Sequence, residues 1–304
     1  MQILAPGYYK KFKCIADRCT HSCCVGWEID VDPDTLAKYK SLQGKMGECI
    51  RASIAEDGDG AHFVLGVNDR CPHLDGRGLC NIIKTLGEGY LCEICREHPR
   101  FYNRVAGQLE CGLGASCEAA AALILSEDGY DRLVPITNVE NLQNARTCAE
   151  FCAKTQRDAL FLLLVDRTRP YAERRREIAT RFAGNIPLNG AEKRQLLASL
   201  EYLDPAHAAL LQEVAGHCEP YAENAVYCER FLAYLIYRHA GPARSAREFA
   251  VSVALALFVE ELFCTLIQAK GIPPVQAVVL LSEELEYSEE NTDALRFALE
   301  CKML

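Results

Sequence analysis

The sequence predicts a mainly α-helical protein, in which an irregular, cysteine-rich, metal-binding region of residues 1–118 packs on a helical domain of residues 119–304. Eleven of the 17 cysteines lie before residue 120. The same region is rich in turn formers, as in Asp57-Gly-Asp-Gly, and has little sustained periodicity. After Ala119 the chain changes to alanine- and leucine-rich stretches with helical spacing. We therefore expect any strands to be short and to lie before residue 120.

The N-terminal region cannot easily build a hydrophobic core by itself. A metal that cross-links its loops would supply the missing order, because metal-binding free energy becomes folding free energy where the metal-free site is unstructured. The cysteines of this region are therefore the first candidates for ligands.

The C-terminal region carries recognisable helix starts. Asn189 and Ser288 are small polar residues followed by early acidic residues, the pattern that helix N-termini favour. The longest apolar stretch, residues 251–267, is interrupted by Glu260 and Glu261, which are costly in a bilayer. We expect this stretch to be a buried helix.

Composition excludes several classes of function. A chain of 304 residues with 50% hydrophobic and 25% charged residues is ordinary globular material. Its net charge of -9 gives no general attraction to phosphate backbones or to anionic lipid, so nucleic acid and membranes are not expected partners. The N-terminal residues lack the charged segment and apolar run of a secretory signal. We expect a cytoplasmic protein.

The first cysteine group is compact. Cys14, Cys19, Cys23 and Cys24 fall within eleven positions, followed by Trp27. In a reducing cytosol disulfides do not persist, so this density points to metal ligation or thiol chemistry. Adjacent cysteines cannot easily point the same way on regular structure, so one of Cys23 and Cys24 is expected to ligate and the other to support or pack.

The second cysteine group is more dispersed. It contains a CxxC at Cys92 and Cys95, which alone is weak because redox and zinc sites both use it. The neighbouring histidines, His21, His73 and His98, are candidate ligands, although a hydrogen-bonding or surface role is favoured for each. The group comprises Cys71, Cys80, Cys92, Cys95, Cys111 and Cys117.

The spacing favours an iron–sulfur cluster over zinc. Structural zinc sites usually show two compact ligand pairs with a regular spacer, whereas here the spacing is irregular and there are more thiols than one tetrahedral ion uses. A 4Fe-4S cluster held by four thiolates fits better, with zinc and other thiol chemistry as the alternatives. The scattered cysteines are expected to pack as small buried hydrophobes: Cys49, Cys148, Cys152, Cys218, Cys228, Cys264 and Cys301.

Several motifs resemble the flagellin lysine N-methylases, which share a cysteine-rich, zinc- or iron-chelating domain. The resemblance covers nearly the whole chain. The motifs are Pro6-Gly-Tyr-Tyr-Lys-Lys-Phe-Lys-Cys14, the run from Cys19 to Trp27, Cys71-Pro-His-Leu, Leu79-Cys80-Asn-Ile, Leu86-Gly-Glu-Gly-Tyr-Leu, Cys95-Arg-Glu-His-Pro-Arg-Phe-Tyr-Asn, residues 110–118, Glu223-Asn-Ala-Val-Tyr, Tyr237-Arg-His and Ser288-Glu-Glu-Asn-Thr.

The resemblance implies an enzyme that uses S-adenosylmethionine to methylate lysine side chains of flagellin, with a 4Fe-4S cluster implicated in the transfer. Cys92 and Cys111 occupy positions where the family has other residue types. Residues 281–290 depart from the family's more basic form. The family's recurrent cysteines fall on Cys14, Cys19, Cys23, Cys24, Cys71, Cys80, Cys95 and Cys117.

Methyl transfer to lysine needs a neutral amine, and therefore a base or a desolvating site. Arg96 and Arg100 are candidates to bind the donor's carboxylate or a cluster sulfur, and Trp27 is a candidate to stack on adenine. An ordinary structural role remains open for each. The candidate catalytic residues near the cysteines are Tyr90, Glu97, His98, Tyr102 and Glu110.

Three classes of function remain open at this point. The first is the S-adenosylmethionine-dependent methyltransferase, whose partner is flagellin or another lysine-bearing protein. The second is a non-catalytic module that binds zinc or iron, and the third is an iron–sulfur redox protein. Affinity for S-adenosylmethionine and a methylated product distinguish the first class from the other two.

Overall fold

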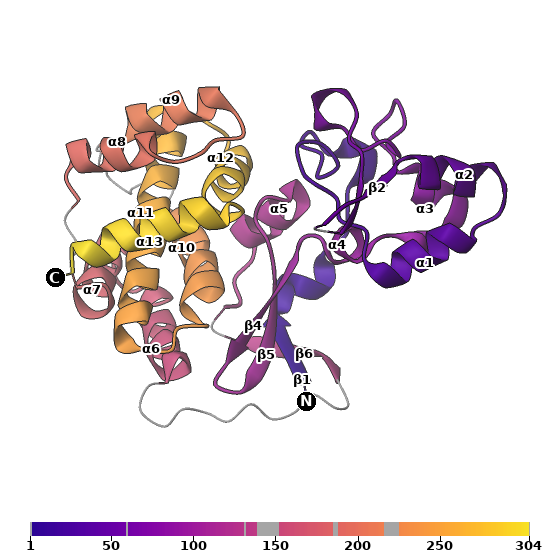
Figure 1. The fold of residues 1–304 in the computed structure, drawn as a ribbon. Helices are drawn as coiled ribbons and strands as arrows, with labels where there is room; N and C mark the ends of the chain where they lie inside the picture. Colours follow the sequence, from indigo (N-terminus) through magenta and orange to yellow (C-terminus); the bar gives the residue numbers. More distant parts are fainter. Residues whose placement is uncertain are drawn as a thin grey trace. The chain divides into compact units, whose positions relative to one another are not determined.

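A computed structural model describes residues 2–58, 60–130, 132–138, 152–184, 188–215 and 225–303. The described chain is mainly α-helical, as the sequence predicts. Its backbone contacts divide it into two compact units. We call Lys13–Arg100 the cysteine unit, and Met1–Phe12 together with Phe101–Leu304 the helical unit (Figure 1).

A small β-sheet determines which segments belong to the helical unit. The sequence predicts a boundary between the two regions at residue 118. In the structure, the backbone contacts end the cysteine unit at Arg100 and assign the first twelve residues to the helical unit. The reason is that β1 (Gln2–Pro6) pairs in parallel with β5 (Gln108–Leu113). This pairing fixes both segments in one sheet.

The sheet has the strand order β4-β5-β1-β6 (Figure 1). β4 (Arg100–Val105) connects to β5 through Ala106 and Gly107, which both have positive φ, the conformation of a tight hairpin turn. β6 (Leu133–Asn138) pairs antiparallel with β1. The expectation that strands end before residue 120 is therefore wrong. Leu133-Val-Pro-Ile forms an edge strand, a place where proline is tolerated.

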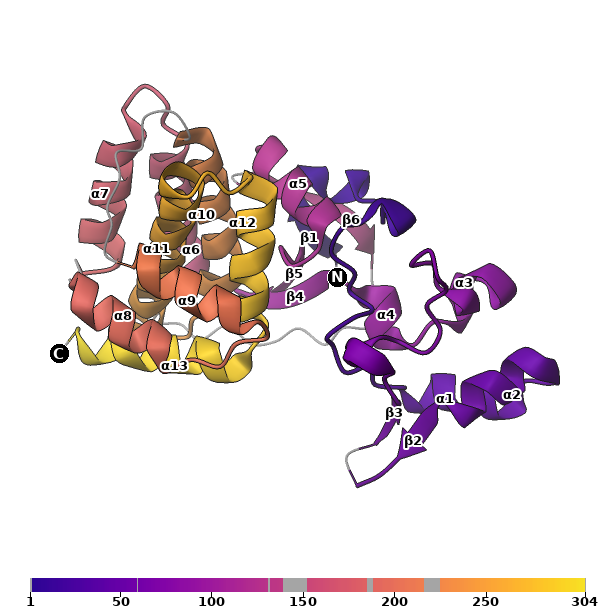
Figure 2. The same ribbon diagram turned by 90° about the horizontal axis from the view of Figure 1, so that it is seen from above.

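Helices α10 and α11 form the centre of the helical unit (Figure 2). α11 contacts α7, α9, α12 and α13. A turn of π-helix, η5 (Ser282–Glu286), joins the last two helices. The helices are α5 (Glu118–Ser126), α6 (Ala153–Leu164), α7 (Tyr171–Phe182), α8 (Gly190–Ala198), α9 (Pro205–Val214), α10 (Ala225–Ala240), α11 (Ala246–Ala269), α12 (Pro274–Leu281) and α13 (Glu289–Cys301).

Helix α11 is the buried helix that the sequence predicts. By length and composition alone it could cross a membrane, but 89% of its most apolar window is buried within the protein. The predicted helix starts are also confirmed. Asn189 caps α8 in a reciprocal capping box with Glu192, and the side chain of Ser288 accepts a hydrogen bond from the backbone of Asn291 in α13.

The cysteine unit is built from short elements around a small core. Ile29, Tyr39, Ile50 and Phe63 are buried in this core together with Cys71 and Cys92. Its elements are α1 (Pro33–Ser41), α2 (Gly44–Ala52), β2 (Ile54–Glu56), β3 (Ala61–Phe63), α3 (Asn81–Leu86) and α4 (Glu93–Glu97). Cysteine side chains thus fill positions in this core that larger apolar residues usually occupy.

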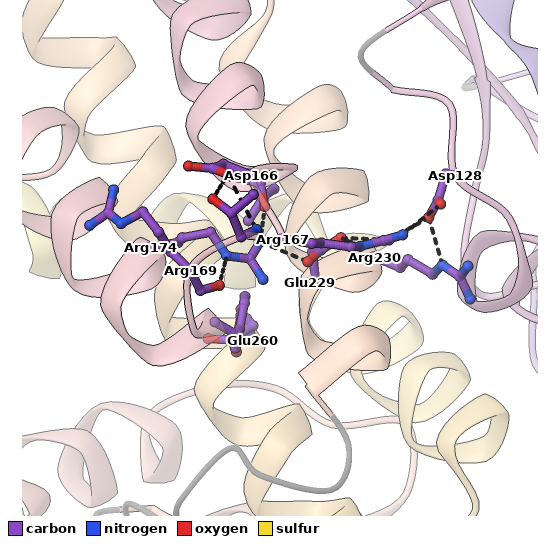
Figure 3. Close-up of polar contacts among 11 residues, drawn as sticks. Asp128, Asp166, Arg167, Arg169, Arg174, Glu229, Arg230 and Glu260 are labelled. Carbon is purple, nitrogen blue, oxygen red and sulfur yellow. Dashed lines mark hydrogen bonds and ion pairs between the residues drawn. The ribbon is translucent and has the colours of Figure 1, made fainter.

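An ion network in the helical unit ties the turn after α6 to α10. Arg167 binds Glu229 at 2.7 Å and Asp128 at 2.8 Å, and Arg174 binds the other oxygen of Glu229 at 2.7 Å (Figure 3). Arg230 also binds Asp128, at 2.9 Å. Because each charge has an opposite partner, this network has a structural role.

Candidate metal centre

Six cysteines of the cysteine unit lie close enough together to influence one another's ionisation. We call them the thiol group: Cys23, Cys24, Cys71, Cys80, Cys92 and Cys95. The group runs from the surface into the core, since Cys23 is exposed and Cys92 is only 1% exposed. It therefore has both a solvent-facing side and an enclosed side.

Backbone pairing of distant segments assembles the thiol group. The amide of Cys71 donates to the carbonyl of Cys24 at 2.9 Å, next to a bridge between Val25 and Arg70. Cys80 pairs with Leu74 and stands at the start of α3. The two cysteines of the CxxC are held by α4, because Cys92 is the N-cap residue of this helix and Cys95 lies within it. Four chain segments thus converge.

Tyr39 anchors the buried end of the group. Its hydroxyl donates to the carbonyl of Tyr90 at 2.5 Å and lies 3.7 Å from the sulfur of Cys92. The Tyr39 side chain is buried in the core of the cysteine unit. The buried Tyr39 side chain therefore lies directly beside Cys92, the most buried thiol of the group.

Four of the thiols form two hydrogen-bonded pairs, Cys23 with Cys24 and Cys92 with Cys95. A hydrogen bond from Cys24 lowers the pKa of Cys23, to which His98 also contributes, and the same bond raises the pKa of Cys24. Likewise a hydrogen bond from Cys95 lowers the pKa of Cys92 and raises that of Cys95. One thiolate in each pair is thus stabilised, and further deprotonation needs a cation to compensate the accumulated charge.

By residue type, this donor set suits a thiophilic metal. Thiolate sulfur prefers zinc, copper(I) and iron–sulfur clusters, whereas magnesium and calcium prefer oxygen. Four of the six sulfurs suffice for one zinc ion or one 4Fe-4S cluster, and the remaining thiols are available as hydrogen-bonding neighbours.

The predicted ligands are only partly brought together. Among the eight predicted cysteines, Cys23, Cys24, Cys71, Cys80 and Cys95 belong to the thiol group. Cys92, which the resemblance leaves out, belongs to it as well, and its CxxC spacing is the signal that identifies it.

The other predicted ligands have different surroundings. Cys14 is exposed, and its sulfur accepts from the amide of Ala16 at 3.4 Å. The thiol of Cys19 donates to the carbonyl of His21 at 2.7 Å. Cys117 belongs to the helical unit, where it precedes α5. The metal roles of these three residues stay predictions.

The candidate catalytic residues are dispersed. His98 contacts Cys23 at the edge of the thiol group, and Glu97 lies near Arg96 at 3.7 Å. Tyr90 is half-buried and Tyr102 is exposed. Glu110 is buried in the helical unit and holds Arg157 through both carboxylate oxygens, which favours a structural role.

The candidate donor-binding residues also differ in their surroundings. Arg96 is exposed, whereas Arg100 is half-buried and donates to the carbonyl of Arg96 at 3.1 Å. Trp27 is half-buried in the cysteine unit. Donor binding by these three residues stays a prediction.

A second set of metal-capable donors lies in the helical unit. Cys228 of α10 and Cys264 of α11 form a disulfide, and the carboxylate of Glu260 lies 3.0 Å from the sulfur of Cys264. The three donor atoms are buried and lie within 4.8 Å of one another, close enough to hold a metal ion when the cysteines are reduced. Glu260 also accepts from Tyr171 and Arg175.

The expectation of buried packing holds for only some of the scattered cysteines. Cys228 and Cys264 are buried as predicted, but they form a disulfide and do not pack as separate thiols. Cys49, Cys152 and Cys301 are exposed, so the prediction is wrong for them, because Cys49 lies on the outer side of α2 and the other two lie at helix ends. Cys148 and Cys218 lie outside the described residues, as do the first two residues of the Glu223 motif.

Comparison with known proteins gives three relatives from Salmonella. The chain is 27% identical over 175 residues to a protein named lysine-N-methylase of Salmonella typhimurium, and equally to one of Salmonella choleraesuis. Each alignment covers 53% of this chain and 41% of the relative. The chain is also 26% identical over 135 residues to the flagellar biosynthetic protein FliU of Salmonella muenchen, covering 41% of this chain and 78% of that protein.

These similarities agree with the motifs that point to the same family. The aligned part of the chain spans about two fifths of the length of the two lysine-N-methylases. No family model matches the chain, and no solved structure is similar to it.

Proposed function

We propose, from its similarity to the lysine-N-methylases, that this chain is an enzyme that transfers a methyl group to lysine side chains of a protein. The names of two relatives support lysine methylation, and the name of the third supports a link to the flagellum. We infer further that flagellin is the acceptor, that the reaction takes place in the cytoplasm, and that S-adenosylmethionine is the donor.

The proposed reaction is a direct substitution at the methyl carbon. The lone pair of a neutral lysine amine forms the new nitrogen–carbon bond while the carbon–sulfur bond of the sulfonium breaks. The electron pair of the broken carbon–sulfur bond stays on sulfur, and the product of the donor is S-adenosylhomocysteine. The methylated ammonium then gives up a proton. A protein site accelerates this step by aligning nitrogen, carbon and sulfur and by favouring the neutral amine.

The thiol group is the structural observation that supports a metal site in the proposed enzyme. It supports a 4Fe-4S cluster held by four of its six cysteines, with zinc as the alternative. A bound cluster would also join the four segments that carry the cysteines, because the free energy of metal binding contributes to folding. A non-catalytic metal-binding module and a redox protein would use the same thiols, so the methylated product has to be measured directly.

The first experiment is purification without oxygen, followed by iron, sulfide and zinc analysis and a methyl-transfer assay with labelled S-adenosylmethionine and flagellin. The proposal expects about four iron and four sulfide per chain and labelled methyl-lysine in the acceptor. Cys24→Ala and Cys71→Ala should lose both the metal and the activity.

The matched control is Cys49→Ala, since Cys49 is an exposed cysteine of the same unit. This variant should keep the metal and the activity. A colourless, zinc-loaded protein that transfers no methyl group would overturn the methyltransferase proposal in favour of a zinc-binding module. A reversible cluster without any methylated product would point to the redox protein instead.

A further inference from the structure

The helical unit contains a cavity of about 450 Å³. This volume is within the range of small-molecule sites. Residues of β4, α10, α11, η5 and α13 line it, among them Phe101, Asn103, Arg238, His239, Glu286 and Arg296. Arg238 and His239 belong to the Tyr237-Arg-His motif that contributes to the family resemblance.

On one side of the cavity the charged side chains are paired with one another. Glu286 binds His239 at 2.7 Å and lies 3.6 Å from the guanidinium of Arg238. The same guanidinium lies over the rings of Phe101 and Tyr287, at 4.9 and 4.8 Å from their centres. These contacts hold Arg238 in place and match its charge with that of Glu286.

The surroundings of Arg296 differ from those of Arg157, Arg167 and Arg174. Its guanidinium donates to Ser252 at 2.8 Å. Among the described residues no carboxylate forms an ion pair with it, although the charges of Asp293 and Glu248 lie near enough to act on its pKa. Arg157, Arg167 and Arg174 are each paired with an acidic side chain. Arg296 is half-buried, and burial lowers its pKa. A guanidinium offers five donors, so most of its capacity remains for an anion.

The cavity also carries a negative group. Glu248 lines it and is exposed, and one of its oxygens accepts from the amide of Arg244 at 2.7 Å. The lining therefore combines a positive group that is partly buried with a negative group that faces solvent. A zwitterion with a carboxylate and an ammonium on the same carbon atom is complementary to this arrangement.

We infer that this cavity binds the amino-acid end of the methyl donor, with the donor carboxylate on the guanidinium of Arg296 and the donor ammonium towards Glu248. The inference rests on the proposed function. It assigns to Arg296 the carboxylate contact for which the sequence suggests Arg96 and Arg100. Arg238, His239 and Glu286 then act as the rigid wall beside the bound head group.

The test is calorimetric titration of the full-length protein, purified without oxygen, with two nucleosides. S-adenosylhomocysteine carries the aminocarboxylate, and 5′-methylthioadenosine lacks it. Arg296→Gln should weaken binding of S-adenosylhomocysteine by about 10- to 100-fold, as expected for a lost charge-assisted contact. Binding of 5′-methylthioadenosine should stay unchanged.

Two further variants keep the test decisive. Arg247→Gln removes an exposed arginine of α11 that pairs with Glu300 at 2.6 Å, and it should bind both nucleosides like the wild type. If Arg296→Gln does not fold, Ser252→Ala removes the hydroxyl that orients Arg296 and should weaken only S-adenosylhomocysteine.

The outcomes separate the two proposals. Equal binding of S-adenosylhomocysteine by the wild type and the Arg296 variant would overturn the cavity assignment and leave the proposed function intact. A wild type that binds no S-adenosylhomocysteine would overturn the donor assignment and the cavity assignment together.

Discussion

Glu110 of β5 and Arg157 of α6 form a bidentate ion pair in which both oxygen–nitrogen distances are 2.7 Å. Both side chains are almost fully buried. The guanidinium also lies 5.4 Å from the centre of the Tyr237 ring. The pair thus links the sheet of the helical unit to its helices, and it accounts for an acidic residue in the buried part of β5.

Removing one partner of this pair is expected to be strongly destabilising. Arg157→Leu would leave the carboxylate of Glu110 buried without compensation, so the free energy of unfolding should fall by about 3–5 kcal/mol. Urea unfolding measures this change. Lys154→Ala on the same helix removes an exposed partner of Asp158 and should cost less than about 1 kcal/mol. Equal losses in the two variants would contradict the structural role of the buried pair.

Cys92 offers a test of the thiol group, because the resemblance excludes it as a ligand whereas in the structure it interacts with Cys71 and Cys95. Cys92→Ala should lower metal affinity by about tenfold or more, since either a ligand or its hydrogen-bonding neighbour is lost. Cys111→Ala is the matched control, because Cys111 is equally buried but lies in the sheet of the helical unit. Metal analysis after dialysis against a chelator compares them, and equal retention would place Cys92 outside the site.

His207 gives the helical unit a predictable pH dependence. Its imidazole lies 2.7 Å from Glu284, and this contact raises the pKa of His207 in the folded protein. The protonated histidine therefore contributes stability fully below its unfolded pKa of about 6.5, and this contribution is lost as the pH rises through the higher folded value.

The difference in unfolding free energy between the wild type and His207→Gln should accordingly be larger at pH 6 than at pH 9. Chemical unfolding at the two pH values measures it. In a Glu284→Gln background the excess at pH 6 should shrink, because the contact that contributes most to raising the pKa of His207 is gone. A larger difference at pH 9 would show that the neutral imidazole is the stabilising form.

Local patterns predict much of the helical unit. The capping residues Asn189 and Ser288 and the buried helix that includes residues 251–267 are confirmed, because caps and helical periodicity depend on neighbours within a few positions. β6 is missed for the opposite reason. Within the described sheet its partner is β1 (Gln2–Pro6), which is far from β6 in the sequence, so no local pattern indicates the pairing.

The sequence by itself determined that the chain is mainly helical and that its N-terminal region is rich in potential thiol ligands, because composition and spacing carry that information. Only the tertiary structure decided which cysteines meet. Cys24 and Cys71 are far apart in sequence and come together through the pairing of Val25 with Arg70, while Cys92 joins them at the start of α4. Ligand sets depend on positions in space, and long-range backbone pairing determines those positions.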